Sequence, residues 1–391
     1  MIKTVQIKNF KSIVDLSLDL GAFNVFIGEN GCGKTNILEA ISFGAAASAD
    51  KLDQEFLGGR GIRVTKPEFM FSAFTNGKKE KAVKIKFIEE YGRIISCNIV
   101  IDPDNSKKWI DTVRQDLFNA IIEISAGLNE NSLKIPNTIA NLYYDVQKLA
   151  KNSQNDDEFH TTLPISENVF TESPIEDYIV YSPEQSTLRK FEESNQMYPL
   201  GINGAGLFQY LKELILDKKN TKILKEIKEN LLLLDWFEDF ELPQNLMSNE
   251  YALKIKDRYL NEHLQYFDQK STNEGFLYLL FYFTLFISKD TPQFFAIDNI
   301  DASLNPKLCM ALTRNLAALA KKHKKQAIVT THNPAILDGL NLKDDNQRLF
   351  VIRRSIDGYT RASRIEYKKE RTMKLSEIWT GGLIGGLPDN F

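Results

Sequence analysis

The stretch Gly28-Glu29-Asn30-Gly31-Cys32-Gly33-Lys34-Thr35 satisfies the pattern G-x-x-x-x-G-K-[ST] at every fixed position. The apolar residues 23–27 precede it, and residues 36–41, with apolar side chains on one side of a helix, follow it. Strand, glycine-rich loop and helix is the order that a phosphate-binding loop requires. The stretch therefore predicts a P-loop in an α/β domain.

Each fixed residue of this loop has its own role in holding a nucleoside triphosphate. Gly28, Gly31 and Gly33 permit backbone angles and a close approach that side chains would block, so that N–H groups can point at the phosphates. Lys34 is expected to bring a cation to the β and γ phosphates, and the Thr35 hydroxyl is expected to hold Mg²⁺. The predicted ATP contacts in this loop are Gly28, Glu29, Asn30, Gly31, Cys32, Gly33, Lys34, Thr35 and Asn36.

A second strand supplies a candidate ligand for magnesium. Residues 294–297 are apolar and are followed by Asp298, the pattern of a buried parallel strand that carries an acid at its carboxyl end. Asp298 is expected to bind Mg²⁺, largely through water. Gly275 stands before this strand, directly ahead of an apolar helical run, and His332 stands after it, at the end of another apolar strand.

These elements resemble the motifs of ABC ATPases of the SMC, RecF and OLD (overcoming lysogenization defect) branch. Residues 271–275 are similar to the signature loop, residues 297–306 to the Walker B and D-loop segment, and residues 330–334 to the switch segment. The opening, residues 7–12, followed by the P-loop is a familiar beginning in that branch. The resemblance covers about residues 1–100 and 270–391 and is thin between them.

The resemblance implies that ATP bound by one subunit is capped by the signature loop of another subunit. Ser271, Asn273 and Gly275 would then contact the partner's nucleotide, and His332 would sense the γ phosphate. Two nucleotides would join two subunits, so a homodimer or a higher oligomer is expected, and it should loosen without ATP. Taken alone, residues 271–275 are better explained as a helix N-cap, and His332 as a histidine in a turn without a ligand; their joint placement around Asp298 favours the ABC interpretation.

The residue after the predicted magnesium ligand departs from the family's pattern. The family usually has Glu there to polarise the attacking water, whereas this chain has Asn299, whose amide cannot take a proton. Hydrolysis is therefore expected to be slow. Asp301 is the nearest spare carboxylate, although a D-loop contact or a cap for the helix that begins near Leu304 is the favoured role for it. The candidate catalytic residues are Lys34, Asn299, Asp301 and His332.

The expected fold class is α/β, a P-loop NTPase head of the ABC type with an antiparallel side sheet and a helical insertion. Residues 83–87 and 94–101 alternate like antiparallel strands, whereas residues 109–149 and 207–237 have helical spacing. The absence of a sustained heptad repeat excludes a long coiled coil. The predicted division is residues 1–105 (Walker A and side sheet), 106–269 (mostly helical insertion lobe) and 270–391 (signature, Walker B, D-loop and switch histidine).

The charge balance supplies no strong attraction to nucleic acid. The 391 residues carry a net charge of −3, and a dedicated DNA-binding protein usually has a basic surplus. Basic runs at residues 218–228 and 321–325 leave DNA contact possible, although solvated helix faces are the favoured explanation for them.

Several features favour a cytoplasmic protein. The three cysteines have no paired spacing for zinc or disulfides, and the N-terminus has no secretory signal. The most apolar segment, residues 276–287, is well short of the roughly 20 residues that a bilayer requires, so no membrane association is expected.

The family resemblance also suggests a biological role. OLD nucleases continue into an acidic metal-binding nuclease domain, whereas this chain ends without one, so a nuclease or toxin effector is expected from a separate protein. The favoured function is an ATP-dependent, dimerising ATPase that acts as a sensor or scaffold in bacterial anti-phage defence, with ATP and Mg²⁺ as ligands. The alternatives are a DNA-processing ATPase of the RecF or SMC kind and a non-hydrolysing scaffold with structural ATP.

Overall fold

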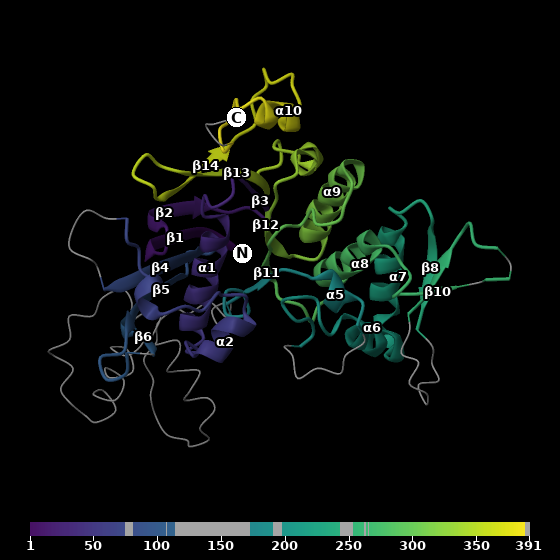
Figure 1. The fold of residues 1–391 in the computed structure, drawn as a ribbon, viewed down its shortest axis with the longest axis horizontal. Coiled ribbons are helices and arrows are strands. Elements are labelled where there is room, and N and C mark those ends of the chain that lie inside the picture. The colour runs from purple at the N-terminus through teal and green to yellow at the C-terminus, as the bar shows by residue number, and fades with distance from the viewer. Residues whose placement is uncertain are drawn as a thin grey trace, which may run out of the picture.

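The computed structural model describes residues 1–74, 81–106, 108–113, 173–190, 198–242, 253–261, 263–264 and 266–387. Its central sheet consists of β3 (Phe23–Ile27), β7 (Ile179–Tyr181), β11 (Phe294–Ile297), β12 (Gln326–Thr330), β13 (Gln347–Arg354) and β14 (Thr360–Ile365). The strand order is β14-β13-β3-β12-β11-β7, in which only the edge strand β14 is antiparallel to its neighbour (Figure 1). The carboxyl ends of the five parallel strands therefore share one edge, where ligands of open α/β sheets bind.

A second sheet forms the side of the molecule. It contains β1 (Ile2–Phe10), β2 (Ile13–Asp19), β4 (Ala82–Glu89), β5 (Ile94–Ile101) and β6 (Trp109–Asp111). Every neighbouring pair in its order β2-β1-β4-β5-β6 is antiparallel, which confirms the strands predicted near residues 83–87 and 94–101. The helical spacing predicted from residue 109 is wrong at its start, because residues 109–111 pair with β5, and residues 114–149 of that prediction lie outside the described residues.

Helix α1 (Lys34–Ser48) lies between the two sheets and is buried along nearly its whole length. It contacts β1, β4 and β5 of the side sheet as well as β7 and β12 of the central sheet. At Gly44 a Cβ atom would lie 2.7 Å from the Ile85 side chain and 2.8 Å from the Phe87 ring. This close approach packs the carboxyl-terminal half of the helix tightly against β4 of the side sheet.

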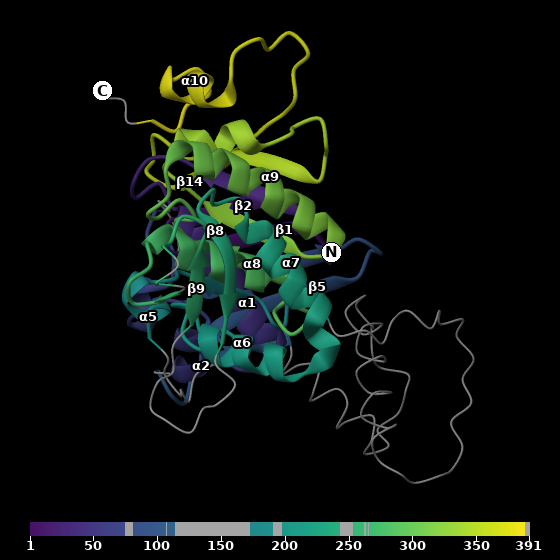
Figure 2. The same cartoon turned by 90° about the vertical axis from the view of Figure 1, so that its right-hand side faces the viewer.

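The opposite face of the central sheet is covered by helices. Helices α8 (Glu274–Ile287) and α9 (Pro306–Lys322) lie on the sheet. Helices α6 (Leu207–Leu216) and α7 (Thr221–Leu231) form a further layer outside α8 (Figure 1). The three-stranded sheet of β8 (Phe237–Glu241), β9 (Lys254–Asp257) and β10 (Phe267–Asp268) lies beyond α7 (Figure 2). Residues 276–287 of α8 are all buried, as predicted from their apolar run, because the helix is packed on every side. Within the described part of the chain, no helix is long and apolar enough to cross a membrane.

The remaining helical turns are short. They are α2 (Gln54–Gly59), η1 (Pro67–Phe69), α5 (Gln185–Leu188), η4 (Lys218–Asn220), η5 (Pro334–Gly339) and α10 (Leu375–Thr380). The range 106–269, expected as a mostly helical lobe, contains α6 and α7 but also contributes β6 to the side sheet and β7 to the central sheet. Because residues 114–172 lie outside the described residues, the division into domains stays a prediction.

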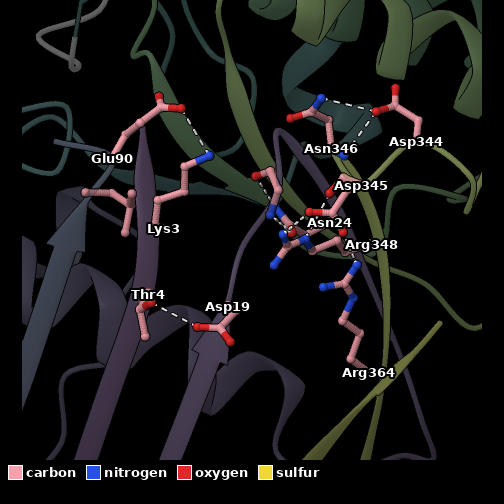
Figure 3. A network of polar contacts seen from close by, with 12 residues as sticks. Lys3, Thr4, Asp19, Asn24, Glu90, Asp344, Asp345, Asn346, Arg348 and Arg364 are labelled. Carbon is pink, nitrogen blue, oxygen red and sulfur yellow. Dashed lines mark hydrogen bonds and ion pairs between the residues drawn. The ribbon is translucent and has the colours of Figure 1, made fainter. Parts of the chain in front are cut away.

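Polar contacts hold the amino-terminal edge of the central sheet (Figure 3). Arg348 of β13 and Arg364 of β14 both form ion pairs with Asp345. The Asn24 amide of β3 accepts a hydrogen bond from the Gly21 N–H and donates to the Ala327 carbonyl of β12, at 2.8 and 3.0 Å. These contacts join the beginnings of neighbouring strands at this edge of the sheet.

Candidate nucleotide-binding site

The loop between β3 and α1 adopts a conformation that depends on glycine. Gly28, Gly31 and Gly33 have φ values of 151°, 76° and 108°. A Cβ atom at Gly28 would lie 2.1 Å from the Ile352 carbonyl oxygen, and one at Gly33 would lie 2.1 Å from Thr360 Oγ1. At Gly31 no atom lies within 4 Å, so only the backbone angle requires glycine there.

A chain of hydrogen bonds from the hairpin of β13 and β14 supports the loop from behind. The Asn36 amide donates to Ser12 Oγ at 2.7 Å, the Ser12 and Thr360 hydroxyls are 2.7 Å apart, and Thr360 Oγ1 donates to the Cys32 carbonyl at 2.9 Å. Arg354 Nε donates to the Gly31 carbonyl at 2.9 Å. No sequence pattern pointed to Thr360 or Arg354, because both lie more than 300 positions along the chain from the loop residues that they hold.

Lys34 places its ammonium group inside the loop. Its Nζ donates to the carbonyl oxygens of Gly28 and Glu29, at 2.8 and 3.0 Å. Burial lowers the pKa of Lys34, whereas the neighbouring Cys32 and Asp298 raise it. The buried ammonium can transfer its hydrogen bonds from these carbonyl oxygens to the oxygens of a phosphate, which its charge attracts.

Asp298 joins the loop to the neighbouring strand. Thr35 Oγ1 donates to Asp298 Oδ2 at 3.0 Å, and Thr330 Oγ1, at the end of β12, donates to Asp298 Oδ1. A hydroxyl oxygen beside a carboxylate is a suitable ligand set for Mg²⁺, which is usually held by one or two such groups together with substrate phosphates and water. In the described residues, no group of three or more His, Cys, Asp or Glu side chains is placed to hold a metal ion.

The residues after Asp298 turn sharply back toward β12. Asn299 has a φ of 57°, a left-handed conformation that Asn tolerates better than most residues, and its N–H donates to Thr330 Oγ1 at 2.9 Å. Asp301 accepts a hydrogen bond from Thr331 Oγ1 at 2.6 Å. The suggestion that Asp301 caps the next helix is wrong, because Asn305 is the N-cap of α9 and accepts from the Leu308 N–H at 3.0 Å.

His332 follows β12 at the same edge of the sheet. Partial loss of its solvent shell lowers its pKa, and the Lys34 ammonium lowers it further, whereas Asp301 and Asp298 raise it. The charges of Lys34, Asp301 and Asp298 therefore act on His332 at this edge of the sheet. A histidine that stays neutral beside these charges can donate or accept a hydrogen bond without adding charge.

The predicted signature segment packs against the residues that lead into α9. Asn273 is the N-cap of α8 and accepts from the Phe276 N–H at 2.9 Å, so the capping explanation holds for this residue. Glu274 accepts from Ser303 Oγ at 2.6 Å, and a Cβ atom at Gly275 would lie 3.5 Å from the Leu304 side chain. The Ser271 N–H donates to Asp268. Among the described residues, no hydrogen bond joins residues 271–275 to the P-loop of the same chain.

The carboxyl-terminal segment also reaches the loop. Ser376, in α10, donates through its N–H and its hydroxyl to Asp338, in the η5 turn that follows His332. A Cβ atom at Gly386 would lie 3.4 Å from the Gly28 Cα atom. The glycine-rich tail therefore packs against the beginning of the P-loop, a contact that its sequence did not indicate.

The parallel part of the central sheet carries a P-loop, an acid at the end of a strand and a histidine at one edge, and an antiparallel sheet flanks it. This combination defines the head of an ABC-type ATPase. The chain belongs to the family of AAA domains described as "putative AbiEii toxin, Type IV TA system", whose model matches residues 23–338.

Shorter stretches are similar to curated proteins of the same kind. The chain is 51% identical over 43 residues to the DNA replication and repair protein RecF of Lactococcus lactis subsp. cremoris MG1363, which is 11% of this chain and 12% of that protein. It is 49% identical over 41 residues to the OLD nuclease of Thermus scotoductus, 10% of this chain and 8% of that protein. A RecF of Clostridium botulinum is 29% identical over 102 residues, 25% of this chain and 27% of that protein. The matches thus span about a quarter or less of these relatives.

Solved structures share the fold over almost the whole chain. An Smc head bound to the C-terminal winged-helix domain of ScpA superimposes with a TM-score of 0.55 at 14% identity, over 95% of this chain and 99% of that one. An Smc head with a coiled coil and joint from Pyrococcus yayanosii gives 0.50 at 13%, over 98% and 99%. The chain is therefore an ABC-type ATPase of the SMC, RecF and OLD branch, as its motifs predicted.

Proposed function

We propose that this protein binds Mg-ATP in its P-loop and that two copies close around two nucleotides. The observation that carries the proposal is the joint placement of the Lys34 ammonium on the Gly28 and Glu29 carbonyls and of Thr35 Oγ1 on Asp298. This arrangement provides a cation for the phosphates and paired oxygens for the metal. We further propose that the protein hydrolyses ATP slowly. It would act as a sensor or scaffold in bacterial anti-phage defence, together with a separate effector protein.

The residues around the site have separable roles in this function. Magnesium, when bound, supplies positive charge that neutralises phosphate oxygens. Thr35 and Asp298 provide its protein ligands, and Lys34 moves its hydrogen bonds from the loop carbonyls to phosphate oxygens. Asn299 can orient a water molecule but cannot accept its proton, and Asp301 is held by Thr331 in a neighbouring position.

The position of the signature segment supports dimer formation. Residues 273–275 pack against Ser303 and Leu304 of their own chain, and among the described residues no hydrogen bond joins them to their own P-loop. They remain available to the nucleotide of a second copy. The three cysteines, all free and buried, suit the reducing cytoplasm that we propose as the location.

ATP-dependent self-association tests the dimer. Light scattering after gel filtration should show a dimer with ATP and Mg²⁺ and a monomer without them. Gly275→Asp places an acid where the partner's phosphates would lie, so it should abolish the dimer while leaving affinity for a fluorescent ATP analogue nearly unchanged. Gly275→Ala is the matched control, since the nearest atoms at 3.5 Å leave room for a methyl group. An ATP-independent dimer, or one that tolerates Gly275→Asp, would contradict the proposal.

Restoring the acid tests the account of hydrolysis. Asn299→Glu should raise the single-turnover rate by about 10- to 100-fold, because a general base typically contributes factors of that size or larger. The left-handed φ of 57° should make the same change cost about 1 kcal/mol of stability. Asn299→Gly keeps this backbone without an acid and should not accelerate turnover.

A shifted general base would give another result. If wild-type turnover is already fast and Asp301→Ala removes it, the acid has moved from position 299 to 301, and slow hydrolysis is refuted. If ATP instead remains bound through extended dialysis and never exchanges, the nucleotide is a permanent structural ligand.

A further inference from the structure

Residues near the carboxyl terminus connect two parts of the nucleotide site that are far apart in sequence. We call residues 375–386, which comprise α10 and the glycine-rich turns after it, the carboxyl-terminal strap. One end of the strap is bound to η5, because Ser376 donates through its N–H and its hydroxyl to the Asp338 carboxylate, at 3.0 and 2.7 Å. The other end is Gly386, which is buried against β13 and the P-loop. The strap therefore extends from the segment after His332 to the beginning of the P-loop.

The η5 end of the strap is linked to the residues around Asp301. Thr331 Oγ1 donates to Asp301 at 2.6 Å and accepts from the Asn333 N–H at 2.9 Å. Asn333 is the N-cap of η5, the turn that carries Asp338. A displacement of the segment that contains His332 would therefore move Asp338 and, with it, the start of the strap.

The other end of the strap contacts the P-loop residue whose carbonyl group Lys34 holds. A Cβ atom at Gly386 would lie 2.7 Å from Val351 Cγ1 and 3.4 Å from the Gly28 Cα atom. Lys34 Nζ donates to the Gly28 carbonyl at 2.8 Å, and this bond breaks when the ammonium turns to a phosphate. Gly28, which is then released by Lys34, is thus the residue against which the strap packs.

The strap has the packing of a single unit between its two ends. Ile378 and Trp379 are buried, with 6% and 3% of their surface exposed. Backbone hydrogen bonds continue from the helix into the turns, since the Leu383 N–H donates to the Ile378 carbonyl at 3.0 Å and the Gly385 N–H donates to the Gly382 carbonyl at 3.3 Å. Closely packed segments transmit a displacement at one end to the other end.

We infer that the carboxyl-terminal strap couples the P-loop to the η5 turn, so that occupation of the loop shifts the segment after β12. This inference rests on the proposed binding of ATP in the P-loop. Coupling free energies are reciprocal, so the strap must also affect the affinity of the loop for its ligand. Releasing the strap leaves the loop to be ordered at the moment of binding, which lowers that affinity.

Two glycines of the strap form a matched pair for testing the P-loop end. Gly386 and Gly382 have φ values of 79° and 74°, but no atom lies within 4 Å of a Cβ atom at Gly382. Gly386→Ala should weaken the binding of a fluorescent ATP analogue with Mg²⁺ by about fivefold or more, the lower end of typical coupling between sites. Gly382→Ala has the same backbone strain and should bind like the wild type. Equal affinities of the two variants would contradict the inference.

Ser376→Ala tests the end that does not touch the P-loop. Without nucleotide, the variant should show faster hydrogen exchange in residues 23–35 by mass spectrometry, because the strap no longer holds the loop. Thr380→Ala is the control, since the Thr380 hydroxyl bonds only to carbonyl groups of α10 itself, and it should exchange like the wild type. If Ser376→Ala leaves the exchange of the loop unchanged, the strap does not couple the two sites.

The double variant Ser376→Ala, Gly386→Ala shows whether the two ends act together. Mutations in one coupled unit are not additive, so its loss of affinity should not exceed the larger of the two single losses. Losses that multiply would mean two independent contacts and would refute the inference. A wild type that does not bind the analogue would refute the proposed function instead, and the exchange measurement without nucleotide would still decide whether the strap holds the loop.

Discussion

Lys34→Ala is expected to weaken ATP binding by about two to three orders of magnitude. The Lys34 ammonium is buried and lies on the loop carbonyls at 2.8 and 3.0 Å, so its charge-assisted hydrogen bonds would pass directly to phosphate oxygens. Bonds of this kind contribute about 1.5–3 kcal/mol each, and about 1.4 kcal/mol corresponds to a factor of ten in affinity. Equilibrium titration with a fluorescent ATP analogue in the presence of Mg²⁺ measures the change.

Two comparisons make this result specific. Lys66→Ala removes an exposed lysine and should leave ATP affinity unchanged. The urea unfolding midpoint of Lys34→Ala should stay close to that of the wild type, since water can reach and solvate the Gly28 and Glu29 carbonyls once the side chain is removed. Wild-type ATP affinity in a folded Lys34→Ala protein would show that the loop is not the nucleotide site.

Gly28→Ala is expected to destabilise the protein by about 3 kcal/mol or more and to abolish ATP binding. The new Cβ atom would lie 2.1 Å from the Ile352 carbonyl oxygen and 2.9 Å from Cys32 Sγ, and the φ of 151° is unfavourable for alanine. The loop can avoid the contact with Ile352 only by moving away from β13, which would also break the hydrogen bonds from the hairpin. Urea unfolding and the same ATP titration measure the two effects.

Gly31→Ala is the matched control in the same loop. No atom lies within 4 Å of its new methyl group, so only the φ of 76° opposes the change, at a cost of about 1 kcal/mol. The difference between the two variants isolates the close packing of the loop against β13. Equal losses of stability would mean that this packing contributes nothing.

The local parts of the site were predictable because they depend on neighbours in sequence. An apolar strand, a glycine-rich loop and a helix follow one another within residues 23–41, and Asp298 directly follows its strand. The carboxyl ends of parallel strands meet at one edge, so the approach of Thr35 to Asp298 follows from the strand order. The residue type of Asn299 already departs from the family's pattern in the sequence, whereas its left-handed backbone is apparent only in the structure.

Other parts could not be predicted because their partners are distant along the chain. Thr360 and Arg354 hold the loop from a hairpin whose sequence shows only alternation. Residues 109–111 have the spacing of a helix, but pairing with β5 decides their conformation, since a short segment follows its tertiary surroundings more than its own preference.

The amino-acid sequence by itself determined the class of this protein and the elements that carry its motifs, because glycine backbone freedom, apolar periodicity and acids at strand ends act over a few residues. Only the tertiary structure decided which side chains meet. It placed Glu274, in the predicted signature segment, on Ser303, and it joined two lysine runs through Glu226. Contacts of this kind depend on how sheets and helices pack, which residue spacing along a single chain does not record.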